Sequence, residues 1–266
     1  NYSIFNIEND LTDSFGFKSE ETGIGYSIGY DYDDKINMSF GIKYNDKKNH
    51  SGTNTNNYIN DNIGNFNQFS FNYSLVYDST NDLFYPSDGT YNKINFEIAP
   101  NVISDDSYYK FRFYNDFYLG KNDEENFFFI SNRLGLADSF NGNLKTVNAF
   151  SLGGLNFKGF DYRGMGPKDG DIYLGGNNFY TITLGYGDQF LFDKKDNMNY
   201  RAFVTSGSIW GSDYSSNNEF ENRVSIGASL DIMTAVFPIS FTYAIPIQKE
   251  DGDKVRRFNF SIGTSF

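Results

Sequence analysis

Residues 36–44 read INMSFGIKY, and this short stretch decides the fold class. Its apolar side chains occupy every second position, at Ile36, Met38, Phe40, Ile42 and Tyr44. Small or polar residues fill the positions between them. A period of two is the period of a β-strand, whose successive side chains point to opposite faces. The stretch therefore predicts a strand with one apolar and one polar face.

The same alternation recurs along the whole chain. Roughly 13 segments of about ten residues show it, separated by polar turns or loops. The expected strands are 2–8, 21–31, 34–46, 65–78, 89–99, 106–119, 125–137, 146–153, 177–189, 198–209, 219–233, 235–245 and 255–266. Tight connections such as 31–34 occur beside long ones such as 154–176. The protein is therefore expected to be all-β.

The composition favours a membrane barrel over a soluble β-sandwich. Aromatic residues make up 19% of the 266 residues, yet the mean hydropathy is -0.54. The polar face of the expected strands is rich in Gly, Ser, Asn and Thr, and it also carries charges: Lys93, Glu97, Lys110, Arg112 and Asp231. A sandwich has no wet inner side for such charges, whereas the lumen of a barrel has one. The pattern predicts a transmembrane antiparallel barrel whose apolar face meets lipid.

Charge and cysteine content exclude several classes of protein. The formal net charge of -12 repels phosphates, so nucleic acid is not an expected partner. There is no cysteine, which excludes a disulfide scaffold and a zinc–cysteine site. The longest clearly apolar run, 127–130, is far shorter than the roughly 20 residues that a spanning helix needs.

Residues that could perform chemistry are sparse. The one histidine, His50, is expected to be a solvated residue in the polar loop DKKNHSGTNTNN at 46–57. A barrel hydrolase needs a Ser–His pair that projects from strands, and no such pair is evident. No stretch has the spaced oxygen ligands of a calcium loop. We therefore expect no enzymatic activity, no cofactor and no metal.

Several motifs resemble those of a known family. The run GGLNFKGFDYRGMGP, residues 153–167, resembles the GG-x-x-x-[VI]-R-G-F…GP motif of the BamA family of outer-membrane protein assembly factors, in the bacterial surface antigen superfamily. YDSTNDLFYPSDG at 77–89 resembles the family's Y-D-x-R-D…F-P-x-x-G strand and turn, and LGGN at 174–177 resembles its re-entry into the next strand. The ending FNFSIGTSF, 258–266, resembles its final strand. The resemblance covers most of the chain from about residue 65 onward.

The resemblance implies a larger barrel and a specific function. Family barrels have about 16 strands, so the chain is expected to be the C-terminal portion, 1–266, of a single barrel domain. The first strands and the POTRA domains would be absent from it. The implied function is to fold and insert other β-barrel proteins in the bacterial outer membrane by strand addition at a lateral seam. The implied partners are outer-membrane lipid, unfolded barrel clients and accessory lipoproteins.

The resemblance also assigns residues. In the family the glycine-rich loop, here about 154–176, folds back into the lumen, and its R-G-F tip contacts acidic residues on the inner wall. The corresponding residues here are Phe157, Lys158, Gly159, Phe160, Gly164, Gly166 and Pro167. The family's Arg is Lys158, and its two inner-wall acids align with Gly185 and Thr205. We expect the loop to enter the lumen, held by Phe157 and Phe160 and by a different acid.

Two further sets of residues follow from the resemblance. The seam and C-terminal signal would comprise Phe258, Phe260, Gly263 and Phe266. The family turn motif would comprise Asp78, Pro86 and Gly89, while the Arg of that motif is replaced by Thr80.

Three other functions compete with an assembly factor. A related two-partner-secretion or translocation barrel shares the superfamily, and the number of POTRA repeats upstream would discriminate it. A passive porin would lack the GF…GP loop motif. A barrel lipid hydrolase is disfavoured because its histidine would have to lie on a strand.

Overall fold

A computed structural model describes residues 1–11, 17–51, 61–120, 126–188, 198–216, 218–234 and 237–263. Within these residues, twelve strands form one antiparallel sheet in the order β1-β2-β3-β4-β5-β6-β7-β11-β12-β13-β14-β16. Their bounds are β1 Tyr2–Leu11, β2 Phe17–Asp31, β3 Ile36–Ser51, β4 Gly64–Asp78, β5 Gly89–Ala99, β6 Tyr108–Gly120, β7 Asn126–Ser139, β11 Asn178–Asp188, β12 Met198–Trp210, β13 Arg223–Met233, β14 Pro238–Gln248 and β16 Phe258–Ile262. The predicted all-β class is confirmed.

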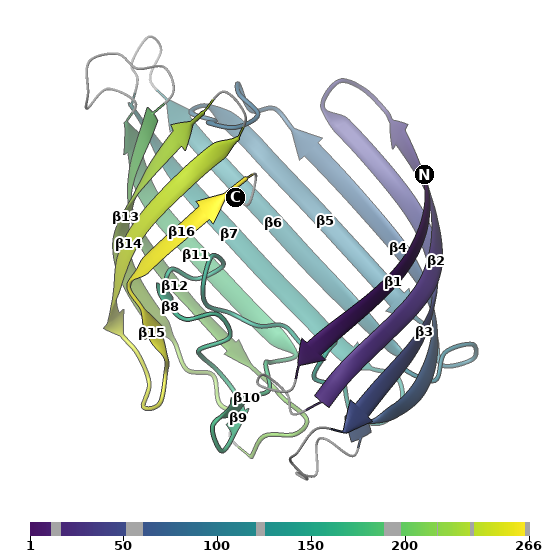
Figure 1. Cartoon of the computed structure of the whole chain (residues 1–266). Coiled ribbons are helices and arrows are strands. Elements are labelled where there is room, and N and C mark those ends of the chain that lie inside the picture. The colour runs from purple at the N-terminus through teal and green to yellow at the C-terminus, as the bar shows by residue number, and fades with distance from the viewer. Residues whose placement is uncertain are drawn as a thin grey trace.

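The sheet curves around segments that belong to its own connections (Figure 1). Its two edges, β1 and β16, are not paired with each other in the described ranges. Two short ladders lie outside the main sheet: β9 (Lys168–Asp169) pairs with β10 (Ile172–Tyr173), and β8 (Gly159–Phe160) pairs with β15 (Val255–Arg256). In the described part of the chain, no helix has the length and apolar character needed to cross a membrane.

The two faces of the sheet differ as the alternation predicts. On β3, Phe40 and Ile42 are exposed on the outer side, whereas Asn45 is buried on the inner side. On β13, Ile226 is exposed and Ser225 is buried. An aqueous protein would not leave such a row of large apolar side chains uncovered, but a lipid-facing barrel surface consists of them.

The apolar run 127–130 interrupts the alternation of the expected strand 125–137, yet Asn126–Ser139 forms a regular strand, β7. Phe127 and Phe129 are buried on its inner face, while Phe128 is exposed on its outer face. The inner pair packs with Tyr118 and Phe203 in an aromatic cluster. The alternation disappears here because both faces of this strand meet apolar surroundings.

One expected strand, 146–153, is wrong. This segment belongs to the connection between β7 and β11, residues 140–177, and makes only an isolated bridge from Phe150 to Gly176. Its apolar residues Phe150 and Leu152 pack into a core formed by that connection. The connection is therefore longer than the expected loop at 154–176, and the main sheet has twelve strands where 13 segments were expected.

The position of His50 also differs from the expectation. Strand β3 continues to Ser51, so His50 lies near the end of a strand and not in a loop. Its side chain is exposed, as expected, and its Nε2 lies 3.6 Å from Glu20 Oε1 on β2. The Asn- and Lys-rich sequence forms a strand here because pairing with β2 satisfies its backbone.

Candidate functional site

The long connection between β7 and β11 carries the main hydrophobic core of the protein. Phe157 and Phe160 are 1% and 0% exposed, and their rings meet edge to face with centroids 5.3 Å apart. Loop and strand residues form one cluster: Ala99, Tyr108, Ala137, Leu144, Phe150, Leu152, Phe157, Phe160, Met165, Phe179 and Ile209. The strand members come from the inner faces of β5, β6, β7, β11 and β12. The predicted entry of the loop into the lumen is confirmed.

Glycine is needed where the loop approaches the wall most closely. Gly166 has a φ of +95°, and a Cβ there would lie 2.5 Å from Ile209 Cγ2. Pro167, which follows, accepts a hydrogen bond on its carbonyl from the Leu174 N–H at 2.9 Å. The N–H of Gly164 donates to the Asp161 carbonyl at 2.9 Å, so this part of the loop folds into a tight turn.

Lys158 projects from the loop toward the wall without a direct carboxylate partner. Its Nζ lies 5.3 Å from the centroid of the Phe203 ring on β12. Burial lowers the pKa of Lys158, and the charge of Asp231 on β13 opposes that shift. Asp231 itself lies 3.5 Å from Arg201 Nε. No carboxylate of the described residues forms an ion pair with Lys158, so the expected acidic partner of the loop tip stays a prediction.

Gly185 and Thr205 are the two positions that align with the family's inner-wall acids, and neither of them carries a charge. A Cβ on Gly185 would lie 2.3 Å from Phe129 Cζ, so the aromatic ring takes the space of the family's acid. Thr205 exchanges a hydroxyl hydrogen bond with Thr183 at 2.9 Å. One feature of the sequence pointed to the Arg201–Asp231 pair: Asp231 is the one carboxylate among residues 223–233, and it lies on their inner face.

The loop is bound to the segment that immediately precedes β16. The N–H of Asp161 donates to the Lys254 carbonyl, and the Lys254 N–H donates to the Gly164 carbonyl, both at 2.8 Å. The ladder of β8 with β15 places Gly159 opposite Arg256 and Phe160 opposite Val255. The hydroxyl of Tyr173 donates to the Gly252 carbonyl. The loop and the connection from β14 to β16 thus form one unit.

A buried ion pair holds that connection to β13. Arg223 is 2% exposed; its Nε lies 3.1 Å from Asp253 Oδ2, and its Nη2 lies 3.2 Å from Asp253 Oδ1. The same guanidinium donates to the Glu221 carbonyl at 2.7 Å. Asp253 also accepts from the Glu250 N–H at 2.8 Å. Sequence inspection did not identify Arg223, because the register that buries it depends on distant residues.

Among the described residues, β16 is the shortest strand of the main sheet. β16 pairs with β14 over five residues, from Tyr243 opposite Phe258 to Ile239 opposite Ile262. Phe258 and Phe260 are 56% and 50% exposed and lie against Phe241 on the outer face. The Gly263 N–H donates to the Pro238 carbonyl at 2.8 Å. Phe266 lies outside the described residues.

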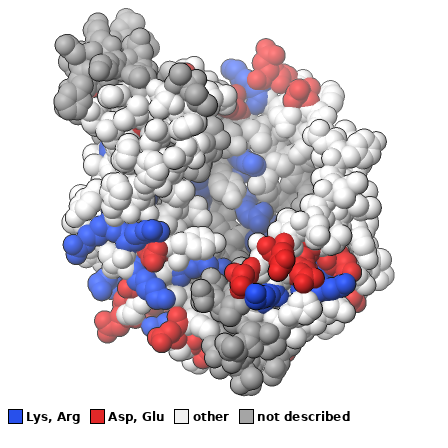
Figure 2. Space-filling model, viewed as in Figure 1, with Lys and Arg blue, Asp and Glu red and all other residues white. Residues whose placement is uncertain are grey.

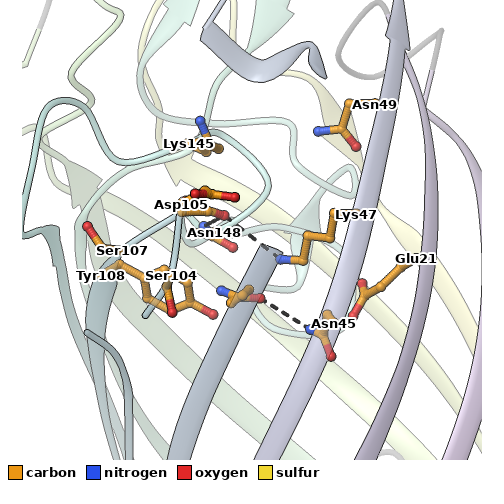
Figure 3. A network of polar contacts seen from close by, with 12 residues as sticks. Glu21, Asn45, Lys47, Asn49, Ser104, Asp105, Ser107, Tyr108, Lys145 and Asn148 are labelled. Carbon is orange, nitrogen blue, oxygen red and sulfur yellow. Dashed lines mark hydrogen bonds and ion pairs between the residues drawn. The ribbon is translucent and has the colours of Figure 1, made fainter. Parts of the chain in front are cut away.

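A polar network ties the loops to the opposite wall of the sheet (Figure 3). Lys47 Nζ on β3 lies 3.9 Å from Asp106 Oδ2, which accepts from Asn148 Nδ2 at 2.9 Å. The Asn148 carbonyl accepts from Lys110 Nζ on β6 at 2.7 Å. Asn45 Nδ2 donates to Gln68 Oε1 at 3.2 Å. Because Lys47, Asp106, Asn148 and Lys110 are buried and joined in this way, they bind the loop at Asn148 to both β3 and β6.

The turn motif lies at the opposite end of the strands, between β4 and β5. Asp78 Oδ1 accepts from the Thr80 N–H at 2.9 Å and from the Thr80 hydroxyl at 2.7 Å. Thr80, which replaces the family's Arg, therefore caps the turn locally. Pro86 lies within this turn, and Gly89 begins β5.

Replacing Gly89 with alanine is expected to destabilise the folded protein by about 1–3 kcal/mol. Gly89 has a φ of +99°, and a Cβ there would lie 2.3 Å from the Ser79 carbonyl oxygen. Urea unfolding followed by fluorescence of the single tryptophan measures the change. Gly29→Ala is the matched control, since nothing lies within 4 Å of a Cβ there. Equal midpoints for both variants would contradict the strained turn.

The described residues contain no group of three or more His, Cys, Asp and Glu side chains that could hold a metal ion. Within the described residues, the site consists of an inner wall with a long loop packed against it, and this loop is bound to the connection that precedes the short strand β16. This arrangement defines a class: an outer-membrane β-barrel with a loop folded into its lumen.

Comparisons with known proteins agree with this class. A family model described as the Omp85 superfamily domain matches residues 1–266, and the chain belongs to that superfamily. The chain is 27% identical over 174 residues to the outer membrane protein assembly factor BamA of Neisseria meningitidis serogroup B, covering 52% of this chain and 21% of that protein. The predicted resemblance to the BamA family is confirmed, and the protein is an integral outer-membrane protein.

Solved structures give the same result for the fold. The structure of BamA from Haemophilus ducreyi lacking POTRA domains 1-3 superposes with a TM-score of 0.85 at 21% identity, over 97% of this chain and 57% of that chain. CdiB from Escherichia coli superposes with a TM-score of 0.57 at 14% identity, over 97% of this chain and 48% of that chain. The chain thus spans about a fifth of the Neisseria protein and just over half of the Haemophilus chain.

Proposed function

We propose that this protein is an outer-membrane protein assembly factor that folds and inserts β-barrel proteins by strand addition at a lateral seam. The physical need is clear. A client strand in lipid must satisfy its backbone hydrogen bonds, and an open edge there costs several kcal/mol for each unpaired group. A barrel that presents an edge lets the client pair while it enters the membrane.

The observation that carries the proposal is the short pairing of β16. Its five residue pairs with β14 compare with ten between β13 and β14. The strand also follows directly on the connection that is bound to the lumen loop. A short terminal strand is easier to displace than a long one, because fewer ladder hydrogen bonds must be exchanged.

The partners of the proposed activity are outer-membrane lipid, unfolded β-barrel clients and accessory lipoproteins. We also propose that the protein acts by binding and not by catalysis. The exposed position of His50 on β3 supports this, since the contact of its Nε2 is with a carboxylate, Glu20, at 3.6 Å and not with a hydroxyl nucleophile. No cofactor enters the proposed mechanism.

Depletion of the full-length protein from its native cell tests the proposal. We expect the outer-membrane level of unrelated barrel proteins to fall on depletion, and the intact gene to restore it. A gene lacking residues 255–266 is expected to fail, because the terminal strand is then absent. Normal levels of all other barrels after depletion would refute the proposal.

A matched pair of variants separates the seam from general damage to the outer face. Phe258→Ser with Phe260→Ser removes two outward aromatics from β16, and Phe117→Ser with Phe128→Ser removes two from β6 and β7. Only the β16 pair, Phe258→Ser with Phe260→Ser, is expected to restore the level of other barrel proteins poorly after depletion. Equal rescue by both pairs would mean that β16 has no special role.

A translocation barrel is the second candidate, supported by the similarity to CdiB. Loss of one secreted protein on depletion, with all other barrels normal, would favour that function. Loss of one solute flux instead would favour a passive porin.

A further inference from the structure

The lumen contains a cavity of about 740 Å³ between the inner wall and the loop. This volume falls within the roughly 300–1,000 Å³ that small-molecule sites in proteins span. Its lining comes from the end of β4 and the turn after it, from β5, β6, β7, β11, β12, β13, β14 and β16, and from the loop around Lys158. The following observations do not depend on the proposed function.

The cavity has the opposite charge to the protein as a whole. The chain has a formal net charge of -12. The cavity is lined by six cationic side chains, Lys93, Lys110, Arg112, Arg133, Lys158 and Arg201, and by three carboxylates, Asp78, Asp82 and Asp116. Figure 2 shows Lys and Arg side chains within the hollow of this face, while Asp and Glu side chains gather toward its rim. Cationic side chains that line one cavity concentrate a positive electrostatic potential within it.

Three of the six cations have a close polar partner. Arg133 Nη2 lies 2.8 Å from each carboxylate oxygen of Asp116. Arg201 pairs with Asp231, and Lys110 donates to the Asn148 carbonyl. These contacts stabilise the wall, but they do not involve Lys93, Arg112 or Lys158.

The remaining three cations lack a close counter-charge. No carboxylate of the described residues lies within 4.0 Å of Lys93 or Lys158. Arg112 Nη1 reaches Glu97 Oε2 only at 4.0 Å, while the other oxygen of Glu97 accepts from Tyr108 at 2.6 Å. Three cations with so little counter-charge around one cavity make this space attractive to an anion.

The strand register places part of this set together. Lys93 on β5 lies opposite Tyr114 on β6, which lies opposite Arg133 on β7. Arg112 is two residues from Tyr114 on the same face of β6, so it is a diagonal neighbour of Lys93. Two neighbouring strands therefore present an ammonium and a guanidinium to the same space. This combination suits an oxyanion, which accepts a fork from Arg and a point charge from Lys.

We propose that the lumen cavity is a binding site for a multivalent oxyanion of the phosphate class. Lys93 and Arg112 bind it from the wall, and Lys158 binds it from the loop. Neutral hydroxyl donors complete the lining: Thr181, Thr183, Ser229, Ser240, Thr242 and Ser261. Because Lys158 belongs to the loop, a bound anion bridges the loop and the β5–β6 wall and stabilises the inserted loop.

Calorimetric titration of the full-length folded protein with tripolyphosphate tests this site. We expect a Kd of about 0.1 mM or tighter at low salt, and weaker binding at high salt, since screening reduces such attraction. Lys93→Gln and Lys158→Gln are each expected to weaken binding about tenfold. Arg112→Lys keeps the charge but removes the fork, so it is expected to weaken binding less than either.

Lys48→Gln is the matched control. Lys48 is exposed on β3, so its substitution removes the same charge at a position outside the cavity. Its Kd is expected to stay within about twofold of the parent protein. Heat-modifiable gel mobility confirms that each variant is folded. Absence of tripolyphosphate binding by the parent protein, or equal losses in Lys48→Gln and Lys93→Gln, would overturn the proposal. Protection of the loop from protease by tripolyphosphate would support the bridge, and unchanged cleavage would overturn it.

Discussion

Replacing Phe160 with alanine is expected to release the lumen loop and to cost about 3–5 kcal/mol. The ring is fully buried between Phe157 and the inner wall, so its removal leaves a cavity that the neighbouring rigid strands cannot fill. Its backbone continues to pair with Val255, but two residue pairs are a weak restraint without the side chain. The measurements are protease cleavage within 153–176 and the urea midpoint.

The control for this variant is Phe117→Ala. Phe117 is an aromatic residue of β6 that is exposed on the outer face. Its truncation removes the same atoms without opening the core, so loop cleavage is expected to stay at the parent rate. If Phe160→Ala and Phe117→Ala are cleaved equally slowly, Phe160 does not hold the loop.

Lys158→Ala is expected to have a smaller effect on the loop than Phe160→Ala. The resemblance predicted a charged contact at this position, but Lys158 faces the ring of Phe203. A cation–π contact contributes about 0.5–2 kcal/mol, which is less than the burial of Phe160. Apolar packing therefore contributes more than charge to holding this loop.

The sequence predicted the strands well where the two faces meet different surroundings. Residues 36–44 lie between lipid and a polar lumen, so their alternation reports the fold directly. Residues 146–153 alternate for another reason: Phe150 and Leu152 point into the loop core. An alternation of period two shows that the two faces of an extended segment meet different environments. It cannot distinguish a strand from an extended loop that covers an apolar cluster.

The loop motif could be placed in the lumen from sequence, but its partners could not. Phe157 and Phe160 are parts of a recognisable pattern, and both are buried as expected. Asp231, whose charge opposes the lowering of the Lys158 pKa, lies on β13, 73 residues away, and only the register of β12 with β13 brings it beside Arg201. A contact that depends on the stagger between strands is not readable from a single sequence.

The final strand, 258–266, was identified from its motif, yet the residue that fixes the connection before it was missed. Arg223 was included in the expected strand 219–233, where its buried end position is not apparent. The pair with Asp253 becomes visible only when the connection from β14 to β16 folds back over β13. Arg223 is buried together with its partner Asp253, which lies 30 residues further along the chain.

Arg223→Met is expected to detach this connection and to destabilise the protein by about 3–5 kcal/mol. The substitution leaves Asp253 as a carboxylate that is 3% exposed and has lost its counter-charge. It also leaves the Glu221 carbonyl without the donor at 2.7 Å. The measurements are the urea midpoint and protease cleavage within 249–254.

A second substitution separates the lost ion pair from lost packing. In Arg223→Met with Asp253→Asn, the buried carboxylate is removed together with its partner, only the partly exposed Glu221 keeps a charge, and the side-chain oxygen of the Asn is expected to accept from the Glu250 N–H. We expect the double variant to recover about half of the lost stability. If the double variant is no more stable than Arg223→Met, the loss comes from packing, and the ion pair is not what holds the hairpin.

Combining Arg223→Met with Phe160→Ala tests whether the lumen loop and the hairpin behave as one unit. The two segments are joined by the ladder of β8 with β15 and by the backbone bonds of Asp161 and Lys254. If either change alone releases both segments, the second change has little left to disrupt. The combined loss is then expected to fall short of the sum by about 1–3 kcal/mol. Additive losses would mean that the loop can leave the lumen while β16 stays in place, and the loop would then have no influence on the proposed seam.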